Sequence, residues 1–267
     1  MLRSLFVGVV FFTTVALLAT VQWLLKTFKL PGRGRIAVAY YGFLCRLLGI
    51  RVRVVGTPVL DRPALMISNH TSWADILAIG STAPVAFVAK SEVRKWPVIG
   101  TIAHLQRTVF VDRQRRQQTG DAIGDMVQRL SENVPVVLFA EGTSSDGNHV
   151  LPFRSALVGA VRDAGVHAAL KDRVVIQPLS ICYTGVQGLP LGRQHRHLTA
   201  WCGDLDLMPH LSALIRRGGI DAVVTFGEPL AAEAEPDRKR LTRRLEDTVR
   251  RITAYTLRGR PEPEQAA

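Results

Sequence analysis

Apolar runs and polar turns alternate along most of the chain, and this alternation predicts the fold class. Short apolar runs bounded by turn residues are typical of buried strands, and longer amphipathic stretches are typical of helices. We expect strands at 52–55, 64–68, 84–89, 107–111, 135–140, 173–181, 197–201 and 220–226. We expect helices at 72–81, 97–105, 117–132, 155–164, 206–217 and 237–257. The alternation of strands and helices indicates an α/β fold, with a largely parallel sheet flanked by helices.

The first apolar run differs from the others because it is long enough to cross a membrane. It extends from Ser4 to Leu25 and contains 22 residues without a charge. One basic residue precedes it and several follow it: Arg3 before, and Lys26, Lys29, Arg33 and Arg35 after. Because the more positive flank usually stays in the cytoplasm, we expect an N-terminal membrane-anchoring helix with the rest of the chain on the cytoplasmic side. The pattern fits both a spanning helix and one that enters a single leaflet.

A cleavable signal peptide is the alternative to this anchor. Its apolar part is usually shorter and ends in small residues before a cleavage site. Here the run ends in Gln22-Trp23-Leu24-Leu25, which favours an uncleaved helix.

The chain is expected to divide into three parts. Residues 1–50 form the membrane anchor and an interfacial segment, residues 51–258 form one catalytic domain, and residues 259–267 form a disordered tail. Within the first part, 36–50 is apolar but contains Arg46, so it either lies at the membrane interface or packs on the domain. The last helix carries an apolar stripe among many arginines, which fits packing on the domain or binding to anionic lipid. The stripe consists of Leu241, Leu245, Val249 and Ile252.

Charge and composition limit the classes of molecule that the protein is expected to bind. The 267 residues carry a net charge of +12, which favours an anionic partner such as a nucleic acid, a membrane surface or a phosphorylated substrate. Binding of nucleic acid would not explain the anchor, and aromatic residues make up only 7% of the chain. We therefore expect an anionic membrane surface and no nucleic acid. The three cysteines, Cys45, Cys182 and Cys202, are widely spaced, which fits a reducing compartment and no disulfide framework.

The first polar cluster that carries chemistry follows the expected strand 64–68. It contains His70 and, five residues later, Asp75. Five residues turn about 500° along an α-helix, which leaves two side chains about 140° apart, so the pair can meet only if His70 lies in the loop. Asp75 would then lie in the first helical turn, with Ser72 as the N-cap of a capping box. A neutral histidine held by a carboxylate can accept a proton from a hydroxyl.

The alternative for this pair is purely structural: a helix-capping carboxylate and a hydrogen-bonded loop histidine. A second pair with the same spacing, His167 and Asp172, has no polar turn before it and is expected to face solvent. No Gly-x-Ser-x-Gly nucleophile motif is present in the sequence, so direct attack by a substrate hydroxyl fits better than an acyl-enzyme.

Two further strand ends carry candidate binding residues. After the run 134–138, Glu141 is suited to a substrate hydroxyl or ammonium, and Gly142 permits a positive φ or a close approach of the ligand. An ordinary polar loop is the alternative there. After the expected strand 107–111, Arg113 is suited to a phosphate or carboxylate as a bidentate donor.

With these residues the chain resembles the glycerolipid acyltransferase family, of the lysophosphatidate acyltransferase type. Four motifs agree in order and spacing between about residues 50 and 185: Asn69-His70 with Asp75, Phe110 to Arg113, Phe139 to Ser145, and Val175 to Leu179. The resemblance implies His70 as general base and Asp75 as the residue that orients it. It also implies substrate-binding residues, among which we count Asn69, Arg107, Arg113, Glu141, Gly142, Thr143 and Arg154.

The same resemblance implies the partners and the location. The acyl donor is expected to be a thioester on acyl carrier protein or coenzyme A, and the acceptor the free hydroxyl of a lyso-lipid. No cofactor and no metal ion is expected. The enzyme would serve phospholipid or related lipid biosynthesis at the bacterial inner membrane, with its catalytic domain on the cytoplasmic face.

Two departures from the family pattern bear on the acceptor. Ala140 replaces a proline, and Ser144 replaces an arginine that is a candidate phosphate contact. The residues around 141–155, together with Trp201-Cys202-Gly203-Asp204 and Pro209-His210, look more like bacterial lyso-ornithine lipid acyltransferases, whose product has no phosphate. The leading prediction is lysophosphatidate, because it is the commoner acceptor in the family, and lyso-ornithine lipid is the alternative.

Two other classes of function are the remaining alternatives. The first is a membrane-anchored binding protein without catalysis. The second is a metal-dependent hydrolase that uses His195 and His197, which have no evident carboxylate ligand nearby in the sequence.

Overall fold

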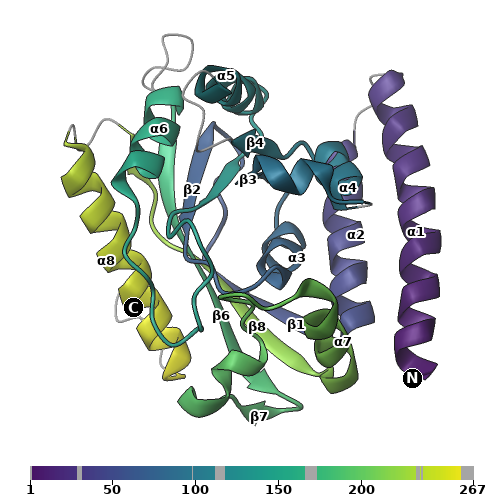
Figure 1. Cartoon of the computed structure of the whole chain (residues 1–267). Helices are drawn as coiled ribbons and strands as arrows, with labels where there is room; N and C mark the ends of the chain where they lie inside the picture. Colours follow the sequence, from purple (N-terminus) through teal and green to yellow (C-terminus); the bar gives the residue numbers. More distant parts are fainter. Residues whose placement is uncertain are drawn as a thin grey trace.

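The protein folds around one mixed β-sheet with helices on both faces (Figure 1). The structure is a computed structural model, and it describes residues 2–28, 32–97, 99–111, 118–165, 173–232, 235 and 237–259. The strands are β1 (Ile50–Val55), β2 (Ala64–Ser68), β3 (Ala86–Lys90), β4 (Val109–Val111), β5 (Val136–Phe139), β6 (Val175–Val186), β7 (Leu189–Pro190), β8 (Ile220–Phe226) and β9 (Leu230–Ala231). The α-helices are α1 (Leu2–Thr27), α2 (Arg33–Leu48), α3 (Ala74–Gly80), α4 (Ile99–Leu105), α5 (Gln118–Ser131), α6 (Ser155–Gly165), α7 (Leu207–Arg217) and α8 (Arg238–Leu257). Two 3₁₀ helices, η1 (Ser91–Lys95) and η2 (Arg193–Leu198), complete the described elements.

The sheet is largely parallel, as the alternation of strands and helices predicts. Its strand order is β1-β8-β6-β2-β5-β3-β4, with β7 and β9 paired to β6. The pairs β1–β8, β2–β6, β2–β5, β5–β3 and β3–β4 are parallel. The pairs that β6 makes with β8, β7 and β9 are antiparallel. The sheet therefore contains two parallel blocks that run in opposite directions and meet between β6 and β8.

The core lies on both faces of the sheet because side chains alternate along each strand. In β2, Met66 belongs to one hydrophobic cluster, and Leu65 and Ile67 belong to the other. The first cluster includes residues of α2, α3 and α7, and the second includes residues of α5, α6 and α8. Since every side chain of β2 is buried, the strand has the continuous apolar sequence of a central parallel strand.

Most of the expected elements match the observed ones closely. Strands 64–68 and 220–226 agree at both ends, and the six expected helices are present with small shifts at their ends. The strand expected at 197–201 is wrong. In its place the chain forms the end of η2 and then an irregular segment, 199–206, whose backbone bonds to the loop after β2. In this segment Ala200 is buried, Trp201 is half-buried and Leu205 is exposed, and the backbone bond from Trp201 goes to Thr71 in the loop after β2 and not to a neighbouring strand.

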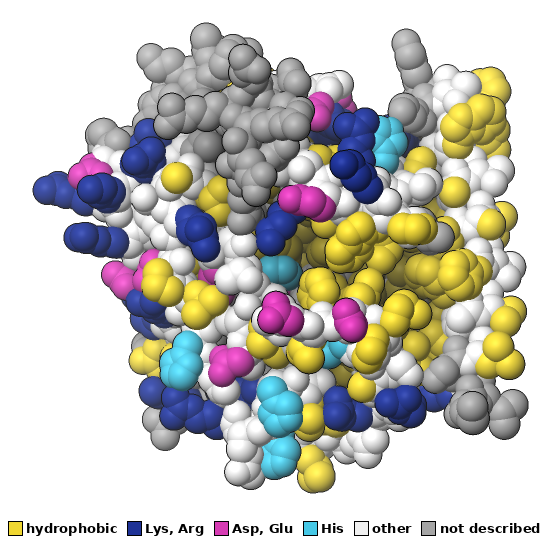
Figure 2. Space-filling model, in the orientation of Figure 1, with side chains coloured by type: hydrophobic (Ala, Val, Ile, Leu, Met, Phe, Trp, Pro, Cys, Tyr) yellow, Lys and Arg dark blue, Asp and Glu magenta, His cyan; other side chains and the backbone are white. Residues whose placement is uncertain are grey.

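Helix α1 packs along the side of the domain, where it contacts α2, α4 and α7 (Figure 1). Within α1, Leu5–Leu25 is long and apolar enough to cross a membrane. Figure 2 shows hydrophobic side chains gathered over the α1, α2 and α4 side of the molecule, around a hollowed apolar surface. This apolar helix indicates membrane association. Its exposed large side chains are Leu5, Phe6, Val9, Phe12, Leu17, Trp23 and Leu24.

Helix α2, which follows the apolar helix, and helix α8, near the C-terminus, both pack on the domain. In α2, Tyr41 and Cys45 are buried, which agrees with packing rather than with a purely interfacial position of 36–50. The predicted stripe of α8 is buried against the sheet and α6, so it is not available to lipid. Residues 260–267 of the expected tail, and the pair His167 and Asp172, lie outside the described residues.

Candidate active site

The two polar clusters of the sequence start at the same edge of the sheet. Strands β2 and β5 are parallel neighbours, and Ser68 pairs with Phe139 at their carboxyl ends. The loops that follow these strands therefore begin side by side, and the backbone N–H of Ser145 donates to the carbonyl of His70 at 2.8 Å. This edge is where open α/β sheets bind their ligands.

His70 and Asp75 form a hydrogen-bonded pair at the start of α3. His70 Nδ1 lies 2.8 Å from Asp75 Oδ2. Because a carboxylate only accepts, Nδ1 carries the proton of a neutral ring, and Nε2 keeps its lone pair. The ring stacks on Phe139 with 4.1 Å between the ring centroids, while 18% of the His70 side chain is exposed. The pair thus holds the His70 ring in one orientation while part of the side chain stays open to solvent.

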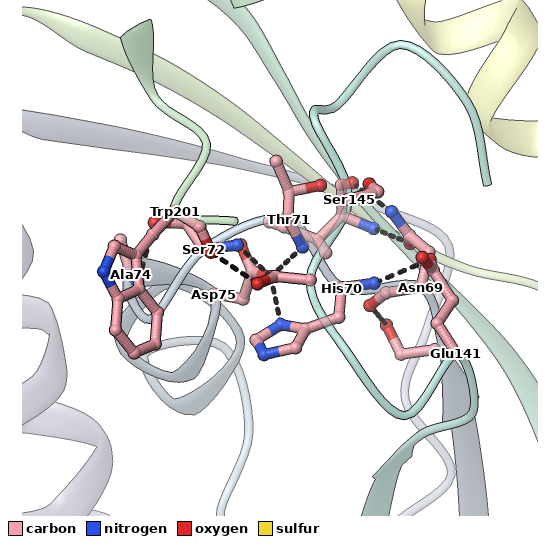
Figure 3. Close-up of polar contacts among 12 residues, drawn as sticks. Asn69, His70, Thr71, Ser72, Ala74, Asp75, Glu141, Ser145 and Trp201 are labelled. Carbon is pink, nitrogen blue, oxygen red and sulfur yellow. Dashed lines mark hydrogen bonds and ion pairs between the residues drawn. The ribbon is translucent and has the colours of Figure 1, made fainter. Parts of the chain in front are cut away.

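The Asp75 carboxylate is completely buried and is held by four donors. Besides His70, its Oδ2 accepts the backbone N–H groups of Thr71 at 2.7 Å and Ser72 at 3.0 Å (Figure 3). Its Oδ1 accepts the hydroxyl of Tyr183 at 2.7 Å. A buried carboxylate needs such partners, and here they leave it one orientation.

The N-terminus of α3 differs from the predicted capping box. The helix begins at Ala74, and Trp73 rather than Ser72 occupies the N-cap position without a side-chain capping bond. Ser72 Oγ accepts the N–H of Ala74 at 3.4 Å, so only the carboxylate half of the motif, from Asp75 back to the loop amides, is formed. Asp75 instead accepts from the loop amides and from His70 at the same time.

Tyr183 is a site residue that the sequence analysis missed. It lies in β6, is 4% exposed, and donates its hydroxyl to Asp75 from the opposite side of the carboxylate to His70. Burial, and then the nearby Asp75 charge, raise the pKa of Tyr183 well above its ordinary value, so the hydroxyl stays protonated. In the sequence it is one aromatic residue in a long apolar strand, and no local signal connects it with Asp75.

Glu141 lies beside His70 on the loop after β5. Its Oε1 accepts the backbone N–H of His70 at 2.9 Å, and its side chain is almost completely buried. Burial raises the pKa of Glu141 to about 8, against the opposing effect of the backbone amides of His70 and Leu151. Among the described residues its Oε2 has no hydrogen-bond partner. Gly142, which follows, adopts φ 74°, the left-handed conformation that the sequence allowed for.

Asn69 joins the two halves of the site through backbone contacts. Its side-chain amide donates to the carbonyl of Ile181 and accepts the N–H of Ile181, both at 2.9 Å. Both ends of the amide are therefore used to connect the β2 loop with β6. The structure gives Asn69 a supporting position, where the sequence analysis counted it among the substrate contacts.

The remaining predicted binding residues are not all brought together. Thr143 is exposed on the Glu141 loop, and exposed Arg154 donates from Nε to the Glu141 carbonyl at 3.2 Å. Arg107 pairs with Glu132 after α5, and no hydrogen bond or ion pair in the described part of the chain joins it to His70 or Glu141. Arg113 lies outside the described residues. His195 and His197 are exposed on η2, and the described residues contain no group of three His, Cys, Asp or Glu side chains suited to a metal ion.

The segment 199–206, which we name the strap, borders both loops. The N–H of Trp201 donates to the carbonyl of Thr71 at 2.9 Å, and the hydroxyl of Ser144 donates to the carbonyl of Trp201. Just beyond the strap, His210 Nδ1 accepts the indole N–H of Trp73 at 3.0 Å. The site is therefore built from the β2 loop, the β5 loop, one β6 tyrosine and the strap.

Comparisons with known proteins agree with this arrangement. A family model described as Acyltransferase matches residues 51–182. Lyso-ornithine lipid O-acyltransferases of Brucella abortus and Rhizobium meliloti are 46% identical over 247 residues and 42% identical over 243 residues. These alignments cover 91% of this chain in both cases, and 91% and 83% of the relatives.

Two further similarities are more distant. The 1-acyl-sn-glycerol-3-phosphate acyltransferase of Neisseria gonorrhoeae is 34% identical over 58% of this chain and 65% of its own. The crystal structure of the 1-acyl-sn-glycerophosphate acyltransferase PlsC from Thermotoga maritima matches with a TM-score of 0.68 and 22% identity, over 98% of this chain and 97% of that one, which shows a shared fold. The resemblance drawn from the four motifs is thus confirmed: the chain belongs to the acyltransferase family and is an enzyme that acts on lysolipids.

Proposed function

We propose that this enzyme is a lyso-ornithine lipid O-acyltransferase. The observation that carries the proposal is the high identity, over nine-tenths of this chain, to two relatives with that name. The relative that acts on 1-acyl-sn-glycerol-3-phosphate is less similar and aligns with little more than half of the chain. These comparisons favour the alternative acceptor of the sequence analysis over lysophosphatidate, its leading prediction.

The chemistry that we propose starts from the His70–Asp75 pair. His70 Nε2 accepts the proton of the acceptor hydroxyl while Asp75 holds Nδ1–H in place. The hydroxyl oxygen then attacks the thioester carbonyl carbon, a C–O bond forms and the C–S bond breaks. The leaving thiolate takes the proton back from His70. General-base assistance of this kind contributes about 10²- to 10⁴-fold to a rate.

The surroundings of the pair support this acceptor. Ser144 provides no cation at the position where the family motif has arginine, and Arg107 is already paired with Glu132. A lyso-ornithine lipid carries no phosphate and therefore does not need a guanidinium at position 144. The apolar hollow beside α1 and α4 suits long acyl chains (Figure 2).

We further propose the donor and the location. The donor is an acyl thioester of acyl carrier protein or coenzyme A, and the reaction needs no cofactor or metal ion. The positive flank of α1 favours the cytoplasmic face of the bacterial inner membrane for the catalytic domain. The exposed apolar face of α1 would hold the site close to its lipid acceptor.

The proposal is tested with membranes from cells that express the wild type, His70→Ala or the control His195→Ala. Each membrane sample receives a labelled acyl thioester, on either carrier, with lyso-ornithine lipid or lysophosphatidate, and the lipid products are separated. We expect ornithine lipid from the wild type and from His195→Ala, and none above background from His70→Ala. Phosphatidate as the sole product of the wild type would overturn the proposed acceptor, and full activity of His70→Ala would overturn the proposed base.

A further inference from the structure

We propose that Ser144 determines acceptor specificity by holding the strap against the loop of His70. The inference rests on the proposed function, because it explains how this site takes an acceptor without phosphate. The inference goes beyond the missing arginine at position 144. The Ser144 hydroxyl makes a hydrogen bond of its own to the strap, and we infer that this bond positions one wall of the site.

The first observation is that a single strap residue connects both catalytic loops. Trp201 donates its N–H to the carbonyl of Thr71, next to His70, at 2.9 Å. The carbonyl of Trp201 accepts the hydroxyl of Ser144, three residues after Glu141. Both backbone polar groups of Trp201 are thus used, and the strap is fixed to the residues that flank the reacting groups.

The second observation is that the strap is ordered at both ends. At its start, Thr199 is 1% exposed, and its hydroxyl donates to the carbonyl of Arg196 at 3.0 Å. Further along, the indole N–H of Trp201 donates to the carbonyl of Leu205 at 2.7 Å, which closes a tight turn. Beyond the strap, the bond from Trp73 to His210 ties the start of α7 to the β2 loop. These bonds hold the strap in place beside the loops after β2 and β5.

The third observation concerns size at position 144. Serine places its donor one carbon from the backbone, so the strap can lie close to the β5 loop. An arginine carries its donors at the end of a long side chain and cannot make this short contact without moving the strap outward. An arginine at position 144 would therefore remove the bond that joins the β5 loop to the strap in its present position.

The charge of the strap fits the same conclusion. The strap contains no basic residue, and its exposed Asp204 and Asp206 form no ion pair within the described part of the chain. The two carboxylates of the strap repel a phosphate group beside this wall and attract an ammonium group. Ser144 keeps this wall next to His70.

The test uses full-length enzyme in membranes with three variants: Ser144→Thr, Ser144→Ala and Ser144→Arg. Initial rates are measured against lyso-ornithine lipid, lysophosphatidate and the acyl thioester. We expect Ser144→Thr, which keeps the hydroxyl, to behave as the wild type. Loss of one hydrogen bond in Ser144→Ala should raise the KM for lyso-ornithine lipid about five- to tenfold, with the KM for the thioester unchanged. Ser144→Arg should lower the preference for lyso-ornithine lipid over lysophosphatidate by at least about tenfold.

The outcomes separate this inference from the proposed function. A wild type that does not acylate lyso-ornithine lipid overturns the proposed function and the inference with it. A wild type that does so, together with unchanged acceptor KM in Ser144→Ala, overturns the inference alone. Equal losses on both acceptors in Ser144→Ala and Ser144→Arg would show a merely structural role and would also overturn it. Thermal melting of the purified variants identifies any that fail to fold, and Ser144→Thr then still tests whether the hydroxyl is sufficient.

Discussion

Replacement of Tyr183 by phenylalanine should weaken catalysis without removing either His70 or Asp75. The substitution deletes only the hydroxyl that donates to Asp75 Oδ1 at 2.7 Å. Asp75 is completely buried, so water cannot easily replace the lost donor, and the carboxylate keeps three of its four hydrogen bonds. The three remaining bonds all go to Oδ2, so Oδ1 loses its donor and the carboxylate can tilt about Oδ2 away from the orientation that suits His70.

The size of the effect follows from the cost of an unsatisfied buried acceptor. That cost is about 1–3 kcal/mol, which corresponds to a factor of about 5 to 150 if it falls wholly on the reactive arrangement. Part of it will appear as lost stability, so we expect kcat to fall about tenfold with the acceptor KM nearly unchanged.

The division of the effect between kcat and KM distinguishes positioning from simple destabilisation. The Tyr183 hydroxyl holds Asp75 in the protein interior. Its loss should therefore lower kcat and leave the acceptor KM nearly unchanged, whereas simple destabilisation would lower Tm and the amount of active enzyme together.

The control is Tyr40→Phe, which removes another largely buried tyrosine hydroxyl. The Tyr40 hydroxyl lies 3.3 Å from the Thr14 hydroxyl, between α1 and α2, and no hydrogen bond in the described part of the chain joins Tyr40 to Asp75. The assay is the initial rate of acyl transfer to lyso-ornithine lipid over a range of acceptor concentrations, with thermal melting of each variant. If Tyr183→Phe has the kcat and acceptor KM of Tyr40→Phe, the positioning argument is refuted.

Three further outcomes follow from the structure. Burial raises the pKa of the Glu141 carboxyl to about 8 in the folded protein, so the folded state binds this proton more tightly than the unfolded chain does. The resulting stabilisation is complete below the pKa of the unfolded chain and is lost as pH rises through about 8. Glu141→Gln should therefore flatten the decrease in Tm between about pH 5 and about pH 9, and an unchanged decrease would contradict the assignment. Leu245→Ala, at a completely buried position of α8, should cost about 2–5 kcal/mol of unfolding free energy in a denaturant titration and leave membrane binding intact. Phe12→Asp, on the exposed face of α1, should do the opposite: sedimentation with vesicles should fall while Tm changes little.

The local pattern of the sequence was sufficient for most of the fold. The apolar run 64–68 and its polar successor predicted a buried strand that ends at a site, because burial on both faces requires a continuous apolar run. The apolar stripe of α8 predicted an amphipathic helix, but the same pattern is expected for a helix that packs on the sheet and for one that binds lipid. The strand predicted at 197–201 is wrong because the backbone there ends a 3₁₀ helix and then bonds to a loop, and an irregular segment can carry the same short alternation of apolar and polar residues as a strand.

The sequence by itself determined the fold class, the apolar N-terminal helix and the nearness of His70 to Asp75, since each depends on residues close together in the chain. Only the tertiary structure decided which distant groups complete the site. Tyr183 reaches Asp75 across 108 positions, and Ser144 reaches Trp201 across 57. These contacts depend on the parallel pairing of β2 with β5 and β6, and no periodicity within one segment records which strand ends become neighbours. The reacting groups could therefore be expected from short motifs. The groups that position them and border the site could be identified only from the folded sheet.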